Sequence, residues 1–436
     1  MQIYLQFSGR FCIFAAMSIN EKTREFINKH VNDDVRKLAL QGVKDEDVDL
    51  TFALQQIAGR QMARQKLPSW AAVEDIVYPP HLNMEQCSSE QTARYKAKIA
   101  GSGESFVDLT GGFGVDFYWM SQGFKHRHYV EKDEALCAIS TENFRLLGLS
   151  CSVNCESAST CLSHLDAVDL IYLDPARRNE YGGRTYSIED CTPNVLELLP
   201  LLMQKANRVM LKLSPMLDWR KAVEDIQKPN ANSQKSIASV SEVHIVSVDN
   251  ECKELLLVLE KGLRVEMGYT LFCVNNESIF KTDDSEQNGT LLSVNHSFTP
   301  SKDRVYSGQA QEPLYLYEPN ASMMKAGCFT ALEQRYPVCQ VAMNSHLFLS
   351  SDEIDDFPGR KFQVQAISSM NKQELKEIVN QKLTPMERAN ISVRNFPLTV
   401  DQLRKKLKLK DGGDVYIFAT TLADGQHRLF ICRKIG

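Results

Sequence analysis

The residues best suited to chemistry lie in a glycine-rich segment, Phe106 to Asp116, where an apolar strand runs into a turn that opens a helix. Glycine is needed where a backbone turns sharply or approaches a ligand closely. A dinucleotide fingerprint would require a small residue where Phe117 stands, and the acid Asp108 suits a cationic ligand such as a sulfonium better than a pyrophosphate. The alternative is a turn that only shapes the backbone. We predict cofactor binding through Asp108, Thr110, Gly111, Gly112 and Gly114.

Two further carboxylates follow the next two expected strands. Glu131 ends the second strand, where a carboxylate can accept hydrogen bonds from both hydroxyls of a ribose. Glu156, followed by Ser157, comes after the third strand and is placed to meet an adenine amino group. Each acid alone would be interpreted as a solvated loop residue. In order after the glycine turn, the two acids and Ser157 favour a nucleoside-containing ligand.

The fourth expected strand ends in Asp174–Pro175–Ala176–Arg177–Arg178, at the sheet edge where cofactor and substrate would meet. We predict that Asp174, Pro175 and Arg177 form the catalytic segment. Asp174 would contact the attacking group, either accepting a proton from it or hydrogen-bonding to it. The alternative for Asp174 is a cap on the turn after the strand. Arg177 and Arg178 can equally be a solvated or ion-paired loop.

The elements that must position these residues alternate between short apolar strands and amphipathic helices. The pattern predicts a parallel sheet with crossover helices. Residues 243–248 and 255–260 are joined by a connection too short for a helix, so they must form an antiparallel hairpin. The expected parallel strands are Phe106–Leu109, His128–Val130, Ser152–Asn154, Asp169–Leu173 and Arg208–Leu213.

The rest of the chain divides by pattern. Residues 17 to about 96 carry helical periodicity, and residues 1–96 form an expected N-terminal helical domain. Ser88, three residues before Gln91, should cap the last helix of this domain. Residues 97–262 form the domain with the parallel sheet. Residues 263–358 form a small α+β domain, for which a ferredoxin-like fold is the candidate, with one helix over 321–335. Residues 359–436 form the last domain, with helices at 372–381 and 400–407.

Composition and charge restrict the possible partners. The net charge is −5, and no apolar run reaches the roughly 20 residues that span a bilayer, so we expect no membrane partner. The short apolar run in residues 1–16 resembles a secretory signal only faintly, and Met17 is an alternative start. From Asn371 onward, 13 Lys and Arg face 7 Asp and Glu, which favours a nucleic acid partner.

The twelve cysteines are scattered without a C-x-x-C pair, which predicts reduced thiols in the cytoplasm and no metal site. Cys151 and Cys155 come closest together along the chain. We interpret them as small packed hydrophobes rather than metal ligands.

The whole series resembles the class I S-adenosylmethionine-dependent methyltransferases. The segments Asp108–Asp116 and Asp174–Arg178, with Glu318–Ala321 and Asn390–Leu398, look like a bacterial methyltransferase family with a THUMP-like C-terminal domain. The resemblance covers most of the chain after about residue 85. It implies a Rossmann-like α/β sheet, S-adenosyl-L-methionine as the cofactor, and structured RNA such as tRNA or rRNA as the partner. The basic run Leu403–Lys410 would contact the RNA backbone, and the alternative is a solvated helix face.

The acceptor of the methyl group stays open at this point. Methyltransferases that act on exocyclic base amines commonly have an aromatic residue in the segment after the fourth strand, which stacks on a flipped base. Here Ala176 and Arg177 replace the usual pattern, and the Arg177 guanidinium could instead stack on a base or bind phosphate. Cys191 could act as the nucleophile of a C5 pyrimidine methyltransferase, although it lies at the start of an expected helix, 195–206, and the sequence indicates no base to activate it.

We expect an enzyme that methylates RNA. The alternatives are a catalytically silent RNA-binding protein with a methyltransferase fold, a methyltransferase acting on protein or a small molecule, and an NAD-dependent oxidoreductase. Phe117 and the terminal hairpin disfavour the last of these.

Overall fold

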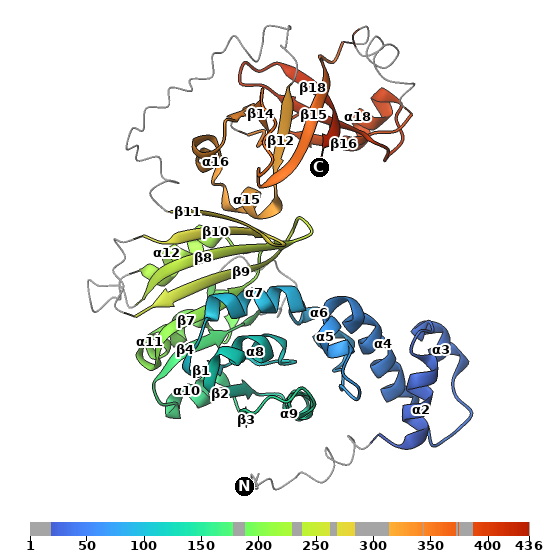
Figure 1. Cartoon of the computed structure of the whole chain (residues 1–436), viewed down its shortest axis with the longest axis vertical. Coiled ribbons are helices and arrows are strands. Elements are labelled where there is room, and N and C mark those ends of the chain that lie inside the picture. Colours follow the sequence, from blue (N-terminus) through green and yellow to red (C-terminus); the bar gives the residue numbers. More distant parts are fainter. Residues whose placement is uncertain are drawn as a thin grey trace. The chain divides into compact units, whose positions relative to one another are not determined.

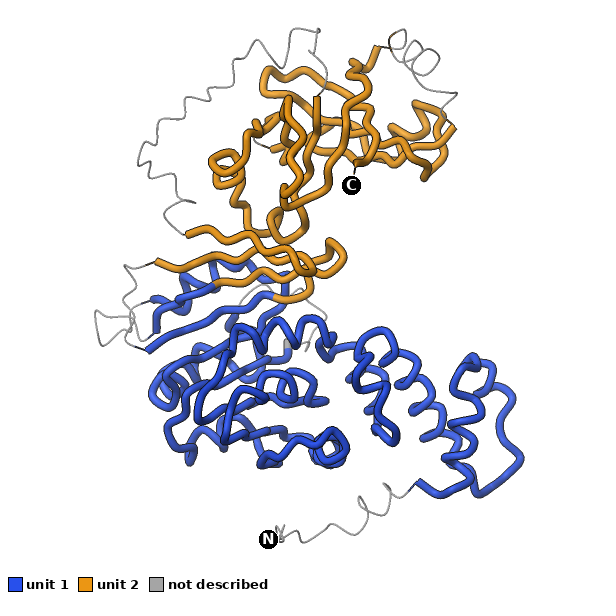
Figure 2. The backbone as a smooth tube through the Cα atoms, viewed as in Figure 1, with its two compact units in different colours: residues 1–242, 255–267 blue, residues 243–254, 268–436 orange. Residues whose placement is uncertain are grey.

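The computed structural model describes residues 19–177, 188–228, 238–261, 268–283, 314–342, 344–371, 374 and 387–435. The chain divides into two compact units, residues 1–242 with 255–267, and residues 243–254 with 268–436 (Figure 2). Residues 1–18, Arg178, Gly262, Met343 and nearly all of the expected helix 372–381 lie outside the described residues.

A nine-stranded sheet organises the centre of the described chain. Its strand order is β11-β10-β8-β9-β7-β4-β1-β2-β3. Strands β1 to β4 and β7 pair in parallel, and β9 runs antiparallel to β7. The predicted α/β fold with its antiparallel hairpin is therefore confirmed, and the sheet continues past residue 262 with β10 and β11. The strands are β1 Gly103–Asp108, β2 Phe124–Glu131, β3 Ser152–Cys155, β4 Val168–Leu173, β7 Ala206–Leu213, β8 Ser239–Val248, β9 Glu251–Glu260, β10 Thr270–Asn275 and β11 Ser278–Asp283.

Helices connect the parallel strands (Figure 1). Between β1 and β3 the connecting helices are α8 (Val115–Met120) and α9 (Glu134–Leu146). The later connections contain α10 (Ala158–His164), α11 (Val195–Lys205) and α12 (Trp219–Gln227), with α10 packing on α11 and α11 on α12. Two strands of two residues each, β5 (Ala176–Arg177) and β6 (Cys191–Thr192), form a separate antiparallel ribbon after β4.

The N-terminal helices pack partly on one another and partly against the sheet unit. A small apolar cluster of Ile27, Leu38, Ala53 and Ile57 holds the first helices together. Farther along, Trp70 and Tyr78 share one buried cluster with Phe106 of β1 and aromatic residues of α8 and α9. The helices are α2 Glu21–His30, α3 Val35–Gln41, α4 Leu50–Lys66, α5 Pro68–Ala71, α6 His81–Gln86 and α7 Glu90–Ala100.

The expected cap of the last N-terminal helix was wrong by one residue. Helix α7 is capped by Ser89, whose Oγ accepts a hydrogen bond from the Thr92 backbone N–H at 3.2 Å. The Ser88 hydroxyl is buried and donates to Asp116 instead, at 2.8 Å. Because Ser88 is hydrogen-bonded to the buried Asp116 carboxylate, Ser89 caps the helix in its place.

Aromatic packing requires the glycines of the turn after β1. A Cβ on Gly111 would lie 2.1 Å from the Tyr129 ring, and one on Gly114 would lie 2.6 Å from the Phe144 ring. Gly114 also has a φ of +84°, a backbone conformation that residues other than glycine adopt only with strain. Phe117, which breaks the dinucleotide fingerprint, is fully buried and stacks on Phe106 with ring centroids 5.8 Å apart.

The second unit contains a seven-stranded sheet of order β13-β14-β12-β15-β18-β17-β16 among its described residues. One expected helix is in fact two, α15 (Ala321–Ala326) and α16 (Phe329–Arg335), because Gly327 takes a φ of +69° and ends the first. Helix α18 (Val400–Leu407) follows β16. The strands are β12 Tyr315–Pro319, β13 Cys339–Gln340, β14 Phe348–Ser350, β15 Gly359–Ser368, β16 Asn390–Arg394, β17 Val415–Thr421 and β18 His427–Ile435.

Two of the segments that carry the family resemblance, Glu318–Ala321 and Asn390–Leu398, meet in this second sheet. The buried Glu318 carboxylate accepts hydrogen bonds from Arg360 Nε at 2.7 Å and from Arg394 Nη2 at 2.9 Å. One glutamate therefore ties β12 to both β15 and β16. None of the described helices is long and apolar enough to cross a bilayer.

Replacing Gly114 with alanine should lower the free energy of unfolding by about 2–4 kcal/mol, because the new Cβ adds a collision to an unfavourable φ. Urea unfolding followed by circular dichroism measures this. Gly148→Ala is the matched control, since Gly148 has a φ of +71° with nothing within 4 Å of its added Cβ. It should lose only the φ contribution, about 1–2 kcal/mol. Equal losses in the two variants would contradict the packing role of Gly114.

Candidate functional site

The carboxyl ends of β1, β2, β3 and β4 bring the predicted site residues to one edge of the sheet. The Gly111 N–H donates to the Val130 carbonyl at 2.9 Å, and the Glu156 N–H donates to the Glu131 carbonyl at 3.0 Å. The Asp174 N–H donates to Thr110 Oγ1 at 2.7 Å. These bonds join the glycine turn to the residues that follow the second, third and fourth strands, as expected for a parallel sheet.

The glycine turn presents open backbone at this edge. Gly112 has a φ of +55°, and a Cβ placed there would meet only the Thr110 carbonyl oxygen, at 3.8 Å. Its N–H donates to Glu131 Oε2 at 2.9 Å. The turn thus holds the Glu131 carboxylate while leaving room for a ligand beside Gly112.

Asp108 is 1% exposed and accepts a hydrogen bond from the Thr110 N–H at 2.9 Å. Burial raises the pKa of Asp108 well above its usual range, and the nearby carboxylates of Asp116, Asp174 and Glu131 raise it further. A positive charge bound beside Asp108 would favour the ionised form. The carboxylate of Asp108 would therefore be stabilised by a cationic ligand.

Glu131 and Glu156 differ in how they are held. Glu131 accepts from Gly112 N and from Asp133 N, both at 2.9 Å, and each of its oxygens can accept a further bond. Glu156 is bonded to Asn154 Nδ2 at 3.1 Å and to His164 Nε2 at 3.0 Å. Burial is the largest influence on the pKa of Glu156 and would raise it, but the hydrogen bonds lower it. An adenine amino group that donates to this carboxylate would therefore compete with Asn154 and His164.

Ser157 has a structural function in addition to its predicted contact with the cofactor. Its Oγ caps α10 by accepting from the Thr160 N–H at 3.1 Å. The hydroxyl also lies 3.0 Å from Ser159 Oγ and 2.8 Å from Thr160 Oγ1. A ligand would therefore reach the Ser157 hydroxyl only in competition with these neighbours.

One group of side chains among the described residues has metal-ligating types close together. Ligand atoms of Glu156, Cys161 and His164 all lie within 4.8 Å of one another. Burial raises the pKa of the Cys161 thiol to about 11, which disfavours the thiolate that a metal needs. The sequence pattern did not point to this group.

Asp174 lies beside a lysine that sequence reasoning missed. Strand β7 is in register with β4, so that Leu173 pairs with Leu211 and the next residues, Asp174 and Lys212, are neighbours. Lys212 Nζ is 2.5 Å from Asp174 Oδ2. Burial raises the pKa of Asp174, and Lys212 opposes that rise.

The rest of the predicted catalytic segment is only partly described. Pro175 is buried, and Arg177 pairs with Cys191 in the β5–β6 ribbon, while the side chain of Arg177 lies outside the described residues. Cys191 is 3% exposed and lies in β6, before α11 begins at Val195. The ribbon nevertheless brings the backbone of Cys191 next to the predicted catalytic segment.

A buried charge cluster connects this edge to α7. Asp116 Oδ1 is 3.0 Å from Lys96 Nζ, its Oδ2 is 3.9 Å from Lys212 Nζ, and Oδ2 also accepts from Ser88 and Tyr172 at 2.8 Å. The Lys96 side chain is 0% exposed. Burial would raise the pKa of Asp116, but the two lysines and the hydrogen bonds outweigh it and lower the pKa.

One residue of this cluster has a recognisable signal in the sequence. Lys212 is an ionisable residue inside the otherwise apolar end of an expected strand, 208–213, and such a residue requires a partner when buried. Lys96 lies in a helix with other basic residues, so from the sequence alone it would be interpreted as a solvated lysine. Its burial depends on tertiary packing that a single sequence does not display.

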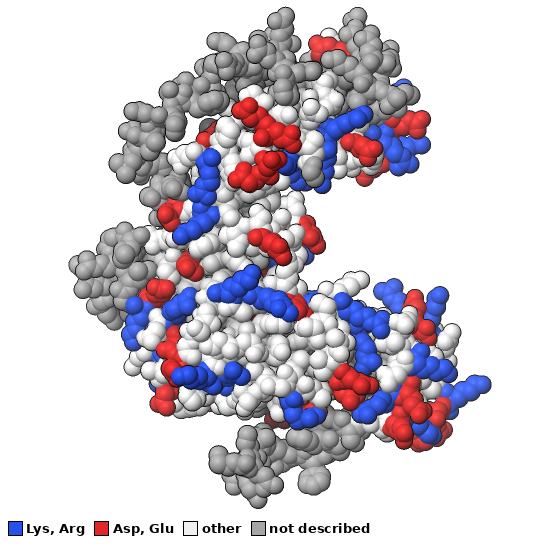
Figure 3. All heavy atoms as spheres, viewed as in Figure 1, with Lys and Arg blue, Asp and Glu red and all other residues white. Residues whose placement is uncertain are grey.

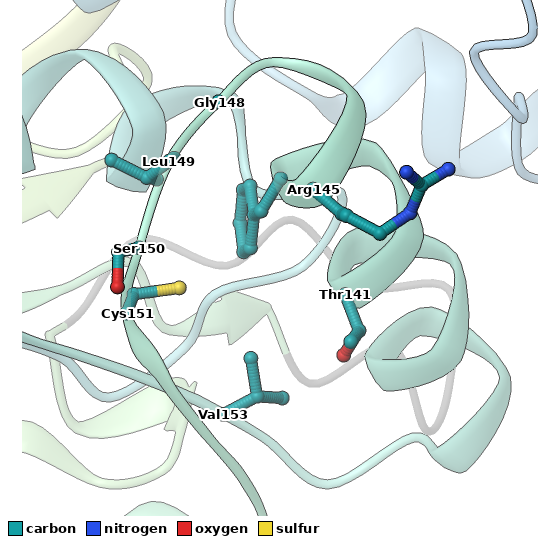
Figure 4. A pocket seen from close by; sticks show the side chains of 8 residues that line it. Thr141, Arg145, Gly148, Leu149, Ser150, Cys151 and Val153 are labelled. Atoms are coloured by element: carbon teal, nitrogen blue, oxygen red, sulfur yellow. The ribbon is translucent and has the colours of Figure 1, made fainter. Parts of the chain in front are cut away.

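A cavity of about 390 Å³ opens elsewhere on the first unit. Thr141, Phe144, Leu149, Cys151 and Val153 are among the residues that line it (Figure 4). The loop that carries Leu149 and Cys151 precedes β3 and so lies at the amino edge of the sheet. This cavity is therefore separate from the edge that carries Asp108 and Asp174.

The basic run of the C-terminal unit lies on and after α18. Lys405, Lys406, Lys408 and Lys410 are exposed, whereas Arg404 is paired with Asp401 and Asp411. In the view of Figure 3, basic and acidic side chains are intermixed on the C-terminal unit. The positive charge is thus local to this run rather than spread over the surface shown.

Comparison with known proteins places these features in context. Residues 359–434 match a family model described as THUMP domain-like, and residues 315–358 match one described as a ferredoxin-like domain. A crystal structure from Porphyromonas gingivalis W83, provisionally described as a methyltransferase, is 27% identical with a TM-score of 0.77, over 99% of this chain and 100% of that chain. Curated protein sequences give no match.

Two other solved structures resemble only part of the chain. A provisionally described methyltransferase from Streptococcus mutans in complex with SAH is 11% identical, with a TM-score of 0.29 over 39% of this chain and 96% of that chain. TrmK of M. capricolum in complex with S-adenosyl-homocysteine is also 11% identical, with a TM-score of 0.30 over 40% of this chain and 69% of that chain. Scores this low support no conclusion about this chain.

The described sheet and the full-length structural match define a protein with the class I methyltransferase fold. Its C-terminus is a THUMP-like domain, as the sequence resemblance implied.

Replacing Lys96 with methionine should lower the free energy of unfolding by about 3–5 kcal/mol, because Asp116 would lose a buried partner. Thermal and urea unfolding measure the change. Lys98→Met is the control on the same helix, since Lys98 is exposed, and its effect should stay within about 0.5 kcal/mol. A loss for Lys96→Met no larger than the control's would show that the pair contributes little.

Proposed function

We propose that the chain is an S-adenosylmethionine-dependent methyltransferase. The observation that carries the proposal is the sign of the charge around the glycine turn. Four carboxylates, Asp108, Glu131, Asp116 and Asp174, lie at or beside this edge, against the two lysines Lys96 and Lys212. Such an excess of acids favours a cationic ligand and opposes a pyrophosphate.

The residues at the edge fit the proposed cofactor. Gly112 offers open backbone, Glu131 has remaining acceptor capacity for the ribose hydroxyls, and Asp108 would gain from a nearby positive charge. Glu156, and Ser157 beside it, would lie near the adenine. When bound, the cofactor supplies a methyl group already activated on a sulfonium. The protein then has to orient the acceptor and exclude water.

The full-length similarity to the Porphyromonas gingivalis structure supports the same activity, since that protein is provisionally described as a methyltransferase. Asp174 is the residue that we assign to the acceptor. It is anchored through its N–H and through Lys212, and its side chain is 35% exposed at the edge where the acceptor would arrive. Pro175 and Arg177 follow it in the same segment.

We further propose RNA, either tRNA or rRNA, as the substrate, and the cytoplasm as the location. The THUMP-like match and the exposed lysines of the α18 run support RNA, because exposed cations bind a phosphate backbone. No disulfide joins any cysteine among the described residues, which fits a reducing compartment.

The test of cofactor class is a thermal-shift comparison of S-adenosylhomocysteine with NAD. A ligand present at 100 times its dissociation constant adds about 2.7 kcal/mol to the free energy of unfolding. Stabilisation by S-adenosylhomocysteine alone supports the proposal, and stabilisation by NAD alone overturns it.

The test of substrate is transfer of a tritiated methyl group to total RNA from a strain lacking the gene. Mass spectrometry of nucleosides from cells with and without the gene then identifies the modified base. RNA binding without methyl transfer would instead favour the catalytically silent RNA-binding protein. Incorporation into protein or small molecules but not into RNA would redirect the substrate assignment.

Replacing Asp108 with asparagine should weaken S-adenosylmethionine binding by about tenfold or more, equivalent to about 1.4 kcal/mol, because the carboxylate charge is lost. S-adenosylhomocysteine lacks the sulfonium and should be affected less. In the wild type, S-adenosylmethionine affinity should rise with pH, since the raised pKa of Asp108 leaves the carboxyl protonated at lower pH. Isothermal titration at several pH values measures both effects.

Asp166→Asn serves as the control for this change. Asp166 is an exposed acid that precedes β4, at the opposite edge of the sheet. Its replacement should leave both affinities unchanged. An Asp108→Asn variant that also binds normally would contradict the placement of the cofactor.

A further inference from the structure

Lys212 is placed to hold the Asp174 carboxylate in one orientation. The parallel register of β4 and β7 makes the two residues neighbours at the carboxyl edge, and Lys212 Nζ lies 2.5 Å from Asp174 Oδ2. The Lys212 side chain is only 12% exposed, so solvent screens this pair less than a surface pair. A short contact in a site with little solvent access holds the Asp174 carboxylate more firmly than a surface ion pair would.

Lys212 is in turn held from its other side. Asp116 Oδ2 lies 3.9 Å from Lys212 Nζ, and the same oxygen accepts from Ser88 and Tyr172. Lys96 is 3.0 Å from the other oxygen of Asp116. The Lys212 ammonium therefore lies between two carboxylates, of which one is rigidly bonded inside the protein and the other is 35% exposed.

We infer that Lys212, fixed by Asp116 and Lys96, is the positioning residue for Asp174 and keeps its carboxylate ionised and aimed at the acceptor. This inference rests on the proposed methyltransferase function. It requires no contact between Lys212 and the substrate. The buried lysine Lys96 takes part by holding Asp116 in place.

The charged groups around Asp174 support this assignment. The acids Asp108 and Asp116 come from β1 and α8, and the lysines Lys212 and Lys96 come from β7 and α7. Burial and Asp116 raise the pKa of Asp174, Lys212 and Lys96 lower it, and the pKa remains above its usual value. Glu131, at the end of β2, is a further acid facing Asp108. Without Lys212 the pKa of Asp174 would rise further, because burial and Asp116 would then be opposed only by Lys96.

The inference narrows the class of acceptor. An ionised Asp174 can take the proton of an N–H or O–H group while that nitrogen or oxygen forms its bond to the methyl carbon. The bound cofactor would supply the methyl group and retain the electron pair of the methyl–sulfur bond, and an Asp174 oxygen would hold the proton. The acceptor is thus a nitrogen or oxygen that carries a removable proton, rather than a ring carbon attacked through a cysteine adduct.

The direct test measures the titration of Asp174 in the full chain by NMR of protein labelled with ¹³C at aspartate carboxyls. The Asp174 resonance is identified by its absence in Asp174→Asn. Lys212→Met should raise the Asp174 midpoint by about 1–3 pH units, because a positive charge in direct contact is lost. Lys212→Arg should keep the midpoint near that of the wild type.

The fold should survive the Lys212→Met change, since Asp116 keeps Lys96, Ser88 and Tyr172 as partners. Lys125→Met is the matched control. Lys125 forms an exposed pair with Glu104 at 2.6 Å on the same unit, so its loss should leave the Asp174 midpoint unchanged. An unchanged midpoint in Lys212→Met overturns the inference, whatever the activity of the protein.

Methyl-transfer rates on RNA give a second readout. The acidic limb of the pH–rate profile should move to higher pH in Lys212→Met, and by the same amount as the NMR midpoint. In an Asp174→Asn background, Lys212→Met should cause no further loss of rate. A wild type that binds no S-adenosylhomocysteine would instead refute the proposed function, and the NMR titration would still decide the Lys212–Asp174 coupling.

Discussion

The contact between Asp116 and its two lysines is the interaction on which the rest of the first unit depends. Asp116 lies in the first turn of α8, directly after the glycine turn, and it bonds to residues of α7, β4 and β7. Displacing this carboxylate would therefore move the turn, the strand edge and the last N-terminal helix together. A charge group buried this deeply is costly unless every member is paired, so the cluster allows few alternative arrangements.

Around this polar centre, the fit of aromatic rings fixes the glycine turn. Tyr129 and Phe144 occupy the space that side chains on Gly111 and Gly114 would need. Phe117 then fills the place where a dinucleotide-binding turn would have a small residue. Phe117, which disfavours dinucleotide binding in the sequence pattern, thus also completes the core beneath the turn.

Sequence patterns predicted the parallel strands and the hairpin, because apolar strands separated by amphipathic helices leave a strong local signal. They failed where a residue's role depends on distant partners. Ser88 had the spacing of a helix cap, yet the buried Asp116 bonds to it and Ser89 caps the helix. Lys96 and Lys212 belong to the site only because packing and strand register bring them there. Helical periodicity likewise predicted the N-terminal helices, but not that Trp70 and Tyr78 would share a core with β1.

The second sheet has a consequence for how this part of the chain can be divided. Family similarity changes between residues 358 and 359, but β12 and β15 pair across that boundary, with Tyr315 opposite Gln363 and Pro319 opposite Gly359. The boundary between the two family models therefore falls inside one sheet. A fragment that starts at residue 359 would expose the hydrogen-bonding edge of β15 and leave Arg360 and Arg394 without Glu318. The two modules are best regarded as a single inseparable body in any expression or evolutionary experiment.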